Sequence, residues 1–288
     1  MKGMGQMDIE KILLKYDEMI AKGELRAAAG YLEKKAAQCG EEGYSTSAIT
    51  IFNELEGFWR VAGEKEKSYA AAEAALALIA TCKMEGSIGH ATTLLNYATA
   101  KTAFGEAKEA LELYDRVEKI YDWQLPEDDY RYAGLYNNMA QSLLRVNDVK
   151  TAGEYFTKSL ALLENMKKVE SETATCHANL AICLMAQKNL EEAGENLKKS
   201  EELFASLPGD PHADSMLATR GQLEYMLGNY AEAAGYYRRA AENIEKRFGQ
   251  NPYYSRACRN CAKALEAAGN KEEAERWQHL ADIALERR

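Results

Sequence analysis

The sequence of 288 residues has few prolines and no long apolar run. Proline breaks a helix interior, so its scarcity permits many helices; Pro126, Pro208, Pro211 and Pro252 are the only four, and each lies at or near an expected helix start. No run approaches the roughly eighteen apolar residues that a membrane span needs. Residues 1–19 show no apolar segment followed by a cleavage site. We therefore expect a cytoplasmic protein with no membrane partner.

The chain also lacks an excess of positive charge and the common catalytic motifs. Its formal net charge is −9 and no basic stripe is visible, which argues against nucleic acid as a partner. No glycine-rich phosphate loop or paired-carboxylate motif occurs, and His90, His212 and His279 have no nucleophile or carboxylate arranged beside them. We expect no enzymatic activity and no cofactor.

The stretch from Leu135 to Leu160 has two helical stripes separated by a turn. Side chains that recur every three or four residues share one face of a helix. The first stripe consists of Tyr136, Met139, Ala140 and Leu143, and the second of Val149, Ala152, Tyr155, Phe156 and Ser159. Asn147 and Asp148 interrupt the pattern with short polar side chains that favour turns. The pattern predicts a helical hairpin.

The same hairpin is repeated through the chain at intervals of 40–42 residues, which is a solenoid period. The turns are Gly23-Glu24, Gly63-Glu64, Gly105-Glu106, Asn147-Asp148, Lys188-Asn189, Gly228-Asn229 and Gly269-Asn270. Seven repeats are expected, at approximately 8–41, 44–84, 87–124, 127–167, 169–207, 211–248 and 252–287. Because each repeat of such a protein contacts only its neighbours, residues 1–288 are expected to form one elongated all-α domain.

Two positions of the repeat are reserved for small side chains, which allow the paired helices to approach closely. Seven residues before the turn stand Ala98, Ala140, Ala181, Gly221 and Ala262; five residues after it stand Ala28, Ala110, Ala152, Ala193, Ala233 and Ala274, with Ser68 in the second repeat. Trp123, before the loop at Pro126, is expected to pack between repeats. In the last helix Gln278 suits a face that meets water, and Trp277, Leu280 and Ile283 leave self-association open.

The six cysteines are spread over the chain. The cluster of Cys176, His177 and Cys183 and the pair Cys258 and Cys261 raise the question of a metal site. Cys258 and Cys261 coincide with the packing stripe and no second pair of ligands lies nearby, so we expect no metal. Free cysteine behaves as a small buried apolar residue, and unpaired cysteines fit a reducing compartment.

These repeats resemble tetratricopeptide repeats. The segment GNYAEAAGYYRRAA at 228–241 is similar to the second half of that motif, while LYNNMAQSLL and HANLAICLMAQKNLEEA resemble the longer repeats of kinesin light chains. About forty residues per repeat exceeds the usual thirty-four of the family. The resemblance implies a right-handed superhelix in which the first helix of each pair lines a concave groove.

Four asparagines occupy one position of the repeat, two residues before the small packing residue: Asn96, Asn138, Asn179 and Asn260. A position two residues back is rotated by about 200 degrees, so these side chains face away from the partner helix. The resemblance implies a clamp in which a carboxamide donates to and accepts from a peptide backbone. Alternatively the asparagines hydrogen-bond adjacent helices. The row is incomplete, since Leu14, Glu54 and Thr219 occupy its other places.

Further residues are expected to line the groove: Asn137, Gln141, Gln222, Tyr225, Ile182 and Met185, a mixture that suits peptide binding. Arg256, Arg259 and Lys263 follow at helical spacing beside Asn260. An acidic side chain or a terminal carboxylate of a ligand could dock on them. Alternatively they form a solvated face on which Lys263 pairs weakly with Glu266.

Three functional hypotheses remain. The first is an interaction scaffold that binds an extended segment of a partner protein in the groove. The second is a sensor of a small signalling peptide, although no helix-turn-helix unit precedes the first repeat. The third is a self-assembling structural unit.

Overall fold

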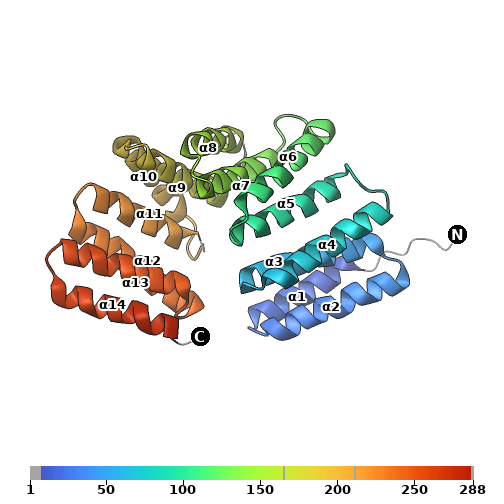
Figure 1. Ribbon diagram of the computed structural model, residues 1–288, viewed down its shortest axis with the longest axis horizontal. Helices are drawn as coiled ribbons and strands as arrows, with labels where there is room; N and C mark the ends of the chain where they lie inside the picture. Colours follow the sequence, from blue (N-terminus) through green and yellow to red (C-terminus); the bar gives the residue numbers. More distant parts are fainter. Residues whose placement is uncertain (1–7, 165, 211, 287–288) are drawn as a thin grey trace. The chain divides into compact units, whose positions relative to one another are not determined.

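The computed structural model describes residues 8–164, 166–210 and 212–286, which contain fourteen helices and no strand. These residues fall into two compact units that divide between Asn147 and Asp148 (Figure 1). The all-α repeat fold expected from the sequence is confirmed. The fourth predicted hairpin spans the boundary between the units, and the single continuous domain stays a prediction.

The first unit contains seven helices: α1 (Ile9–Ala21), α2 (Leu25–Glu42), α3 (Ser45–Ala62), α4 (Lys65–Thr81), α5 (Ile88–Ala103), α6 (Ala107–Gln124) and α7 (Arg131–Arg145). Three hairpins, α1–α2, α3–α4 and α5–α6, follow one another, and each second helix also packs on the next first helix. The first helices α3, α5 and α7 contact one another in that order. They therefore form a layer whose remaining face does not pack on the second helices.

The second unit contains the other seven helices: α8 (Val149–Leu163), α9 (Glu170–Ala186), α10 (Leu190–Ala205), α11 (Ala213–Met226), α12 (Tyr230–Phe248), α13 (Pro252–Ala267) and α14 (Lys271–Glu286). The hairpins α9–α10, α11–α12 and α13–α14 repeat the arrangement of the first unit, and α9 contacts α11 (Figure 1). Pro252 opens α13, where its missing amide proton costs least. Pro211 and the predicted boundary residue 287 lie outside the described residues.

All seven predicted turns contain a residue with positive φ. The φ angle is between 76° and 90° at the five glycines and is 65° at Asn147 and 63° at Lys188. In six turns the next amide donates to a carbonyl five residues back, for example Glu106 N to Lys101 O at 2.8 Å. This bond closes the end of a helix when one residue is left-handed. Glycine fills most of these places because it adopts that conformation without strain.

The small residues at the helix crossings are buried as predicted. Ala98, Ala110, Ala181 and Ala193 have no exposed surface. At Gly221 an added Cβ would lie 3.0 Å from the Tyr237 ring, which explains glycine at that position. The size alternation read from the sequence is therefore a packing requirement.

Two expectations about aromatic residues need correction. Trp123 does not pack between repeats: its side chain is 85% exposed. It follows the buried Tyr121 by two positions on α6, and that offset turns it away from the core. In α14, by contrast, Trp277 and Leu280 are partly buried and pack against the core of the second unit. Within the described part of the chain, no helix is long and apolar enough to cross a membrane.

Candidate peptide-binding surface

Asn96 and Asn138 lie on α5 and α7, two first helices that contact each other in the first unit. Both side chains are half-buried. Two residues further along each helix, Ala98 and Ala140 are buried. Within the described ranges, neither asparagine carboxamide makes a hydrogen bond. Each amide therefore keeps its donor and acceptor capacity at a position that is only partly open to water.

Asn179 and Asn260 lie on α9 and α13 of the second unit and are also half-buried. Asn179 has an interaction partner. The carboxamide of Asn260 has no hydrogen bond to any residue that the structure describes. The alternative in which the asparagines hydrogen-bond adjacent helices is therefore not observed for Asn96, Asn138 or Asn260. Buried amides that hold a fold together are normally paired.

Asn137 and Gln141 flank Asn138 on α7; Asn137 is half-buried and Gln141 is exposed. On α11 of the second unit, Gln222 is exposed and Tyr225 is 40% exposed. The Tyr225 ring meets the Tyr230 ring edge-on, with 5.1 Å between the centroids. This contact fixes the orientation of an aromatic face that remains open to a ligand.

Met185 and Ile182 do not offer the apolar lining that the sequence suggested. Met185 is 2% exposed and belongs to the hydrophobic core of the second unit, and Ile182 is half-buried against the same core. The same core contains Met216, Leu217 and Leu223 of α11, which contacts α9. At the equivalent position of the next repeat, Tyr225 remains exposed.

The basic residues of α13 point toward solvent. Arg256 and Lys263 are exposed and Arg259 is half-buried. Among the residues with described coordinates, none of the three has an ion pair, so the predicted weak pairing of Lys263 with Glu266 does not occur. The Arg256 guanidinium lies 5.4 Å from the centre of the Tyr253 ring. The patch therefore retains its charge for an anionic group.

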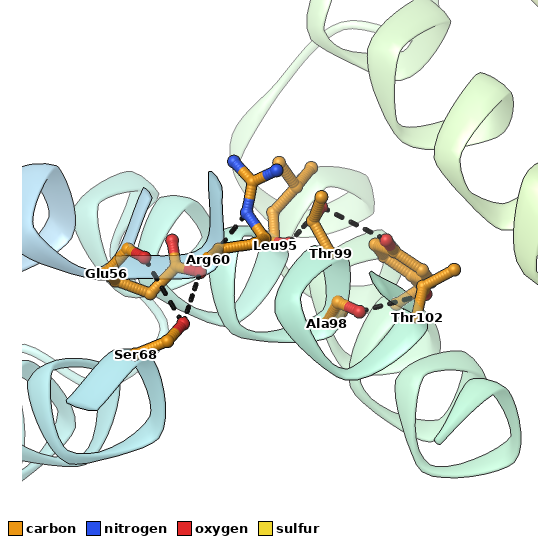
Figure 2. A network of polar contacts seen from close by, with 8 residues as sticks. Glu56, Arg60, Ser68, Leu95, Ala98, Thr99 and Thr102 are labelled. Atoms are coloured by element: carbon orange, nitrogen blue, oxygen red, sulfur yellow. Dashed lines mark hydrogen bonds and ion pairs between the residues drawn. The ribbon is translucent and has the colours of Figure 1, made fainter. Parts of the chain in front are cut away.

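A buried carboxyl group at the α3–α4 crossing was missed by the sequence reading. Glu56 is 1% exposed and stands where five of the other six repeats have alanine or glycine and the first has Tyr16, and Ser68 faces it where most have alanine (Figure 2). The Ser68 hydroxyl lies 3.2 Å from the Glu56 carbonyl oxygen and 3.3 Å from its Oε1, and Arg60 Nε lies 3.4 Å from Oε1. The sequence could have revealed this group, because alignment of the turns places Glu56 seven residues before Gly63, at the crossing position.

This carboxyl group is only partly satisfied. Oε2 of Glu56 has no hydrogen-bond partner among the described residues. Burial raises the pKa of Glu56 to about 7, while Arg60 and Ser68 oppose the rise and Glu54 adds to it. An ionised carboxylate at this position is costly, which is the physical cause of the shift.

The α5–α6 hairpin carries hydroxyl groups next to its alanine crossing and one turn along from it. The Thr99 and Tyr114 hydroxyls are 3.2 Å apart, and Thr99 Oγ1 donates to Leu95 O at 2.9 Å (Figure 2). The Thr102 and Ser142 hydroxyls are 2.6 Å apart, and Thr102 also donates to Ala98 O. These groups satisfy one another and link α5, α6 and α7.

The four cysteines of α9 and α13 are buried at packing positions, whereas Cys82 is exposed. Burial raises the pKa of the Cys176 and Cys261 thiols to about 12 and that of Cys183 and Cys258 to about 11. Such thiols stay protonated, which disfavours nucleophilic or ligand roles. His177 Nδ1 and Asn196 Oδ1 are hydrogen-bonded at 2.8 Å. In the part of the chain with described coordinates, no three His, Cys, Asp or Glu side chains are grouped to hold a metal ion.

Sequence comparison identifies one segment directly. Residues 170–246 match the tetratricopeptide repeat family. This segment covers α9 to α11 and most of α12, in the second unit. No match was found among curated proteins.

Several solved structures share the fold. BtubC (BKLC) from P. vanneervenii is 21% identical with a TM-score of 0.60, over 74% of this chain and 86% of that one. A putative kinesin light chain from Podosopora anserina is 18% identical with a TM-score of 0.54, over 67% and 93%. The quorum sensor NprR from B. thuringiensis is 15% identical with a TM-score of 0.73, over 96% and 76%. The predicted resemblance is therefore confirmed: this chain is similar in fold to tetratricopeptide repeat proteins, kinesin light chain repeats included, and carries the family's sequence pattern at residues 170–246.

Proposed function

We propose that this protein is an interaction scaffold that binds an extended segment of a partner polypeptide along the exposed face of its first helices. The observation that carries the proposal is the state of the asparagines: Asn96, Asn138 and Asn260 are half-buried, and their carboxamides make no hydrogen bond within the described part of the chain. A fold does not retain such groups for its own stability, because an isolated polar group gains nothing by partial burial.

An extended peptide backbone offers alternating donors and acceptors, and a carboxamide matches both. On the contacting helices α5 and α7, Asn96 and Asn138 occupy equivalent places of successive repeats. The neighbouring Gln141 can add a third amide. In the second unit, the basic residues Arg256, Arg259 and Lys263 of α13 would favour a ligand with an acidic side chain or a free carboxylate.

Peptides selected from a displayed library of random dodecamers provide the test. Selection against the intact chain is followed by measurement of Kd for one selected peptide by fluorescence anisotropy. The double variant Asn96→Ala, Asn138→Ala is expected to raise Kd by about tenfold per asparagine, because each amide supplies two hydrogen bonds. The melting temperature should stay unchanged.

The matched control is Gln278→Ala, which removes a half-buried amide of α14 that donates to Asp282 Oδ1 at 2.9 Å. It should leave Kd unchanged. A large drop in the melting temperature of the double variant would instead show that the asparagines stabilise the packing of the repeats. An unchanged Kd would show that they do not bind the peptide.

Recognition of a short signalling peptide is the second candidate. The fold is shared with the quorum sensor NprR over 96% of this chain, which supports a peptide ligand without naming it. Blocking the carboxyl terminus of the selected peptide separates the candidates, since a free signalling peptide would use its terminus and an internal segment would not. We place the protein in the cytoplasm, in keeping with its six free cysteines. Self-association through α14 has less support, since Trp277 and Leu280 pack inward.

A further inference from the structure

Trp123 and Tyr130 stand at either end of the connection between α6 and α7. Trp123, on the last turn of α6, is 85% exposed, and Tyr130, immediately before α7, is 66% exposed. Neither side chain is needed in the core of the first unit. Large exposed aromatic side chains are the residues that most often anchor protein interfaces. We call residues 122–131 the acidic aromatic loop.

Carboxylates lie close to these two aromatic residues in the sequence. The acidic aromatic loop contains Asp122, Glu127, Asp128 and Asp129 and a single basic residue, Arg131. Arg131 is engaged by Asp129: Nε lies 2.7 Å from Oδ1, and the guanidinium also donates to Oδ2 at 2.8 Å. The other three carboxylates are exposed and have no cation paired with them among the described residues. The loop thus carries uncompensated negative charge beside a tryptophan.

Hydrogen bonds tie this loop to the rest of the first unit. Gln124 Nε2 donates to Gly86 O at 3.1 Å, and the Tyr132 hydroxyl donates to Asp122 Oδ1 at 2.9 Å. The Asp129 amide donates to Pro126 O at 3.1 Å. Because the surroundings of Trp123 are already ordered, a ligand would bind without the cost of ordering them.

We propose that the acidic aromatic loop is a docking surface for a segment of another protein that carries lysine or arginine side chains. Cations bind over aromatic faces, tryptophan best of all, and nearby carboxylates strengthen the attraction. The loop itself shows the geometry: the Arg131 guanidinium lies 5.5 Å from the centre of the Tyr130 ring. The Trp123 face is left for a cation from outside. These residues are separate from the asparagines, so the two surfaces can be tested independently.

The test uses two synthetic dodecapeptides, one of alternating lysine, arginine and glycine and one in which glutamate replaces every basic residue. Binding to the intact chain is followed by anisotropy of a label on the peptide. The basic peptide should bind and the acidic one should not. Trp123→Ala should weaken binding about tenfold, in line with a desolvated cation–aromatic contact. Glu127→Gln with Asp128→Asn should weaken it several-fold and reduce its dependence on salt.

Two matched controls separate a specific site from general attraction to an acidic protein. Tyr253→Ala removes an aromatic side chain that is 63% exposed but lies beside Arg256. Glu195→Gln with Glu202→Gln removes the same amount of charge from exposed positions on α10. Both should leave binding unchanged. The proposal fails if these controls weaken binding as much as the loop variants, if Trp123→Ala has no effect, or if light scattering shows that the loop variants abolish a self-associated form instead.

Discussion

The α3–α4 and α5–α6 hairpins are built on the same repeat, yet their crossing points differ in chemistry. In α5–α6 the two positions hold Ala98 and Ala110, and neither residue has exposed surface. In α3–α4 the same two positions hold Glu56 and Ser68, and both are buried as well (Figure 2). The hydroxyl groups of α5–α6 lie beside this crossing and hydrogen-bond to one another, whereas Glu56 Oε2 has no hydrogen-bond partner within the described ranges.

The difference shows how much polarity this helix contact tolerates. In α3–α4 a hydroxyl from Ser68 faces the carboxyl group and the Arg60 guanidinium lies one turn along. Even then the compensation is partial, since burial raises the pKa of Glu56 to about 7. A partly satisfied polar group is usually less stable than an apolar contact in the same place.

Transfer of the carboxyl group to the other hairpin should have the largest effect. In Ala98→Glu the new side chain would face Ala110 and would have Thr102, not arginine, one turn along. We expect the free energy of unfolding to fall by about 3–5 kcal/mol, the cost of burying an unpaired ionisable group. Urea denaturation followed by circular dichroism measures the change.

The companion variant Ala98→Glu, Ala110→Ser restores the hydroxyl that faces Glu56 in the neighbouring hairpin. It should recover about 1 kcal/mol, the net value of one hydrogen bond. If Ala98→Glu alone is as stable as the parent chain, the helix crossings are packed more loosely than their burial indicates. The conclusion that the α5–α6 crossing excludes an unpaired carboxyl group would then be wrong.

The pH dependence of α3–α4 should show the next largest effect. The pKa of Glu56 is about 7 in the folded chain, above its ordinary value of 4.5. The folded chain therefore keeps a proton that the unfolded chain has released, and stability falls as pH rises from 4.5 through 7. We expect a loss of about 3 kcal/mol over that range. Glu56→Gln should remove this dependence, as measured by urea denaturation between pH 5 and 8.

Glu66→Gln is the control for this prediction, since Glu66 is an exposed carboxylate on α4. It should leave the pH profile as in the parent chain. A profile of Glu56→Gln that runs parallel to that of the parent would mean that Glu56 is ionised throughout and that Arg60 compensates it fully.

The repeat architecture was predictable because it is encoded by local patterns. The turn residues, small crossing residues and helical stripes each act within a few positions of the chain, and all seven turns adopt the left-handed backbone that Gly23 or Asn147 suggests. Trp123 was misplaced because it lies two positions from Tyr121, so only one of the two can face the core. The sequence does not reveal that this residue is Tyr121. Met185 was misplaced because it packs into the hydrophobic core of the second unit.

The candidate site was predictable only in part. The sequence locates the asparagines by their place in the repeat, but whether their amides are paired depends on what neighbouring helices bring near them. Asn179 has a partner whereas Asn138, in the same repeat position, has no hydrogen bond to its carboxamide within the described ranges. The charge of the acidic aromatic loop is legible in the sequence, while the exposure of its tryptophan is not. Side-chain pairing and exposure are tertiary properties that a repeat pattern does not specify.

Tyr114→Phe should have the smallest effect. It tests the α5–α6 hairpin, in which the hydroxyl groups hydrogen-bond to one another. Tyr114 is almost fully buried on α6, and its hydroxyl bonds to that of Thr99. After the change, Thr99 still donates to Leu95 O, and the Thr102 and Ser142 hydroxyls still bond to each other. We therefore expect a loss of only about 0.5–1.5 kcal/mol in the free energy of unfolding, measured in urea. The sign matters most: removal of a hydroxyl from a satisfied network must destabilise the chain, whereas removal of the Glu56 charge above pH 7 must stabilise it. A gain of stability in Tyr114→Phe would show that the hydroxyl network is strained. The two hairpins would then differ in where their polar groups lie, and not in whether those groups are fully hydrogen-bonded.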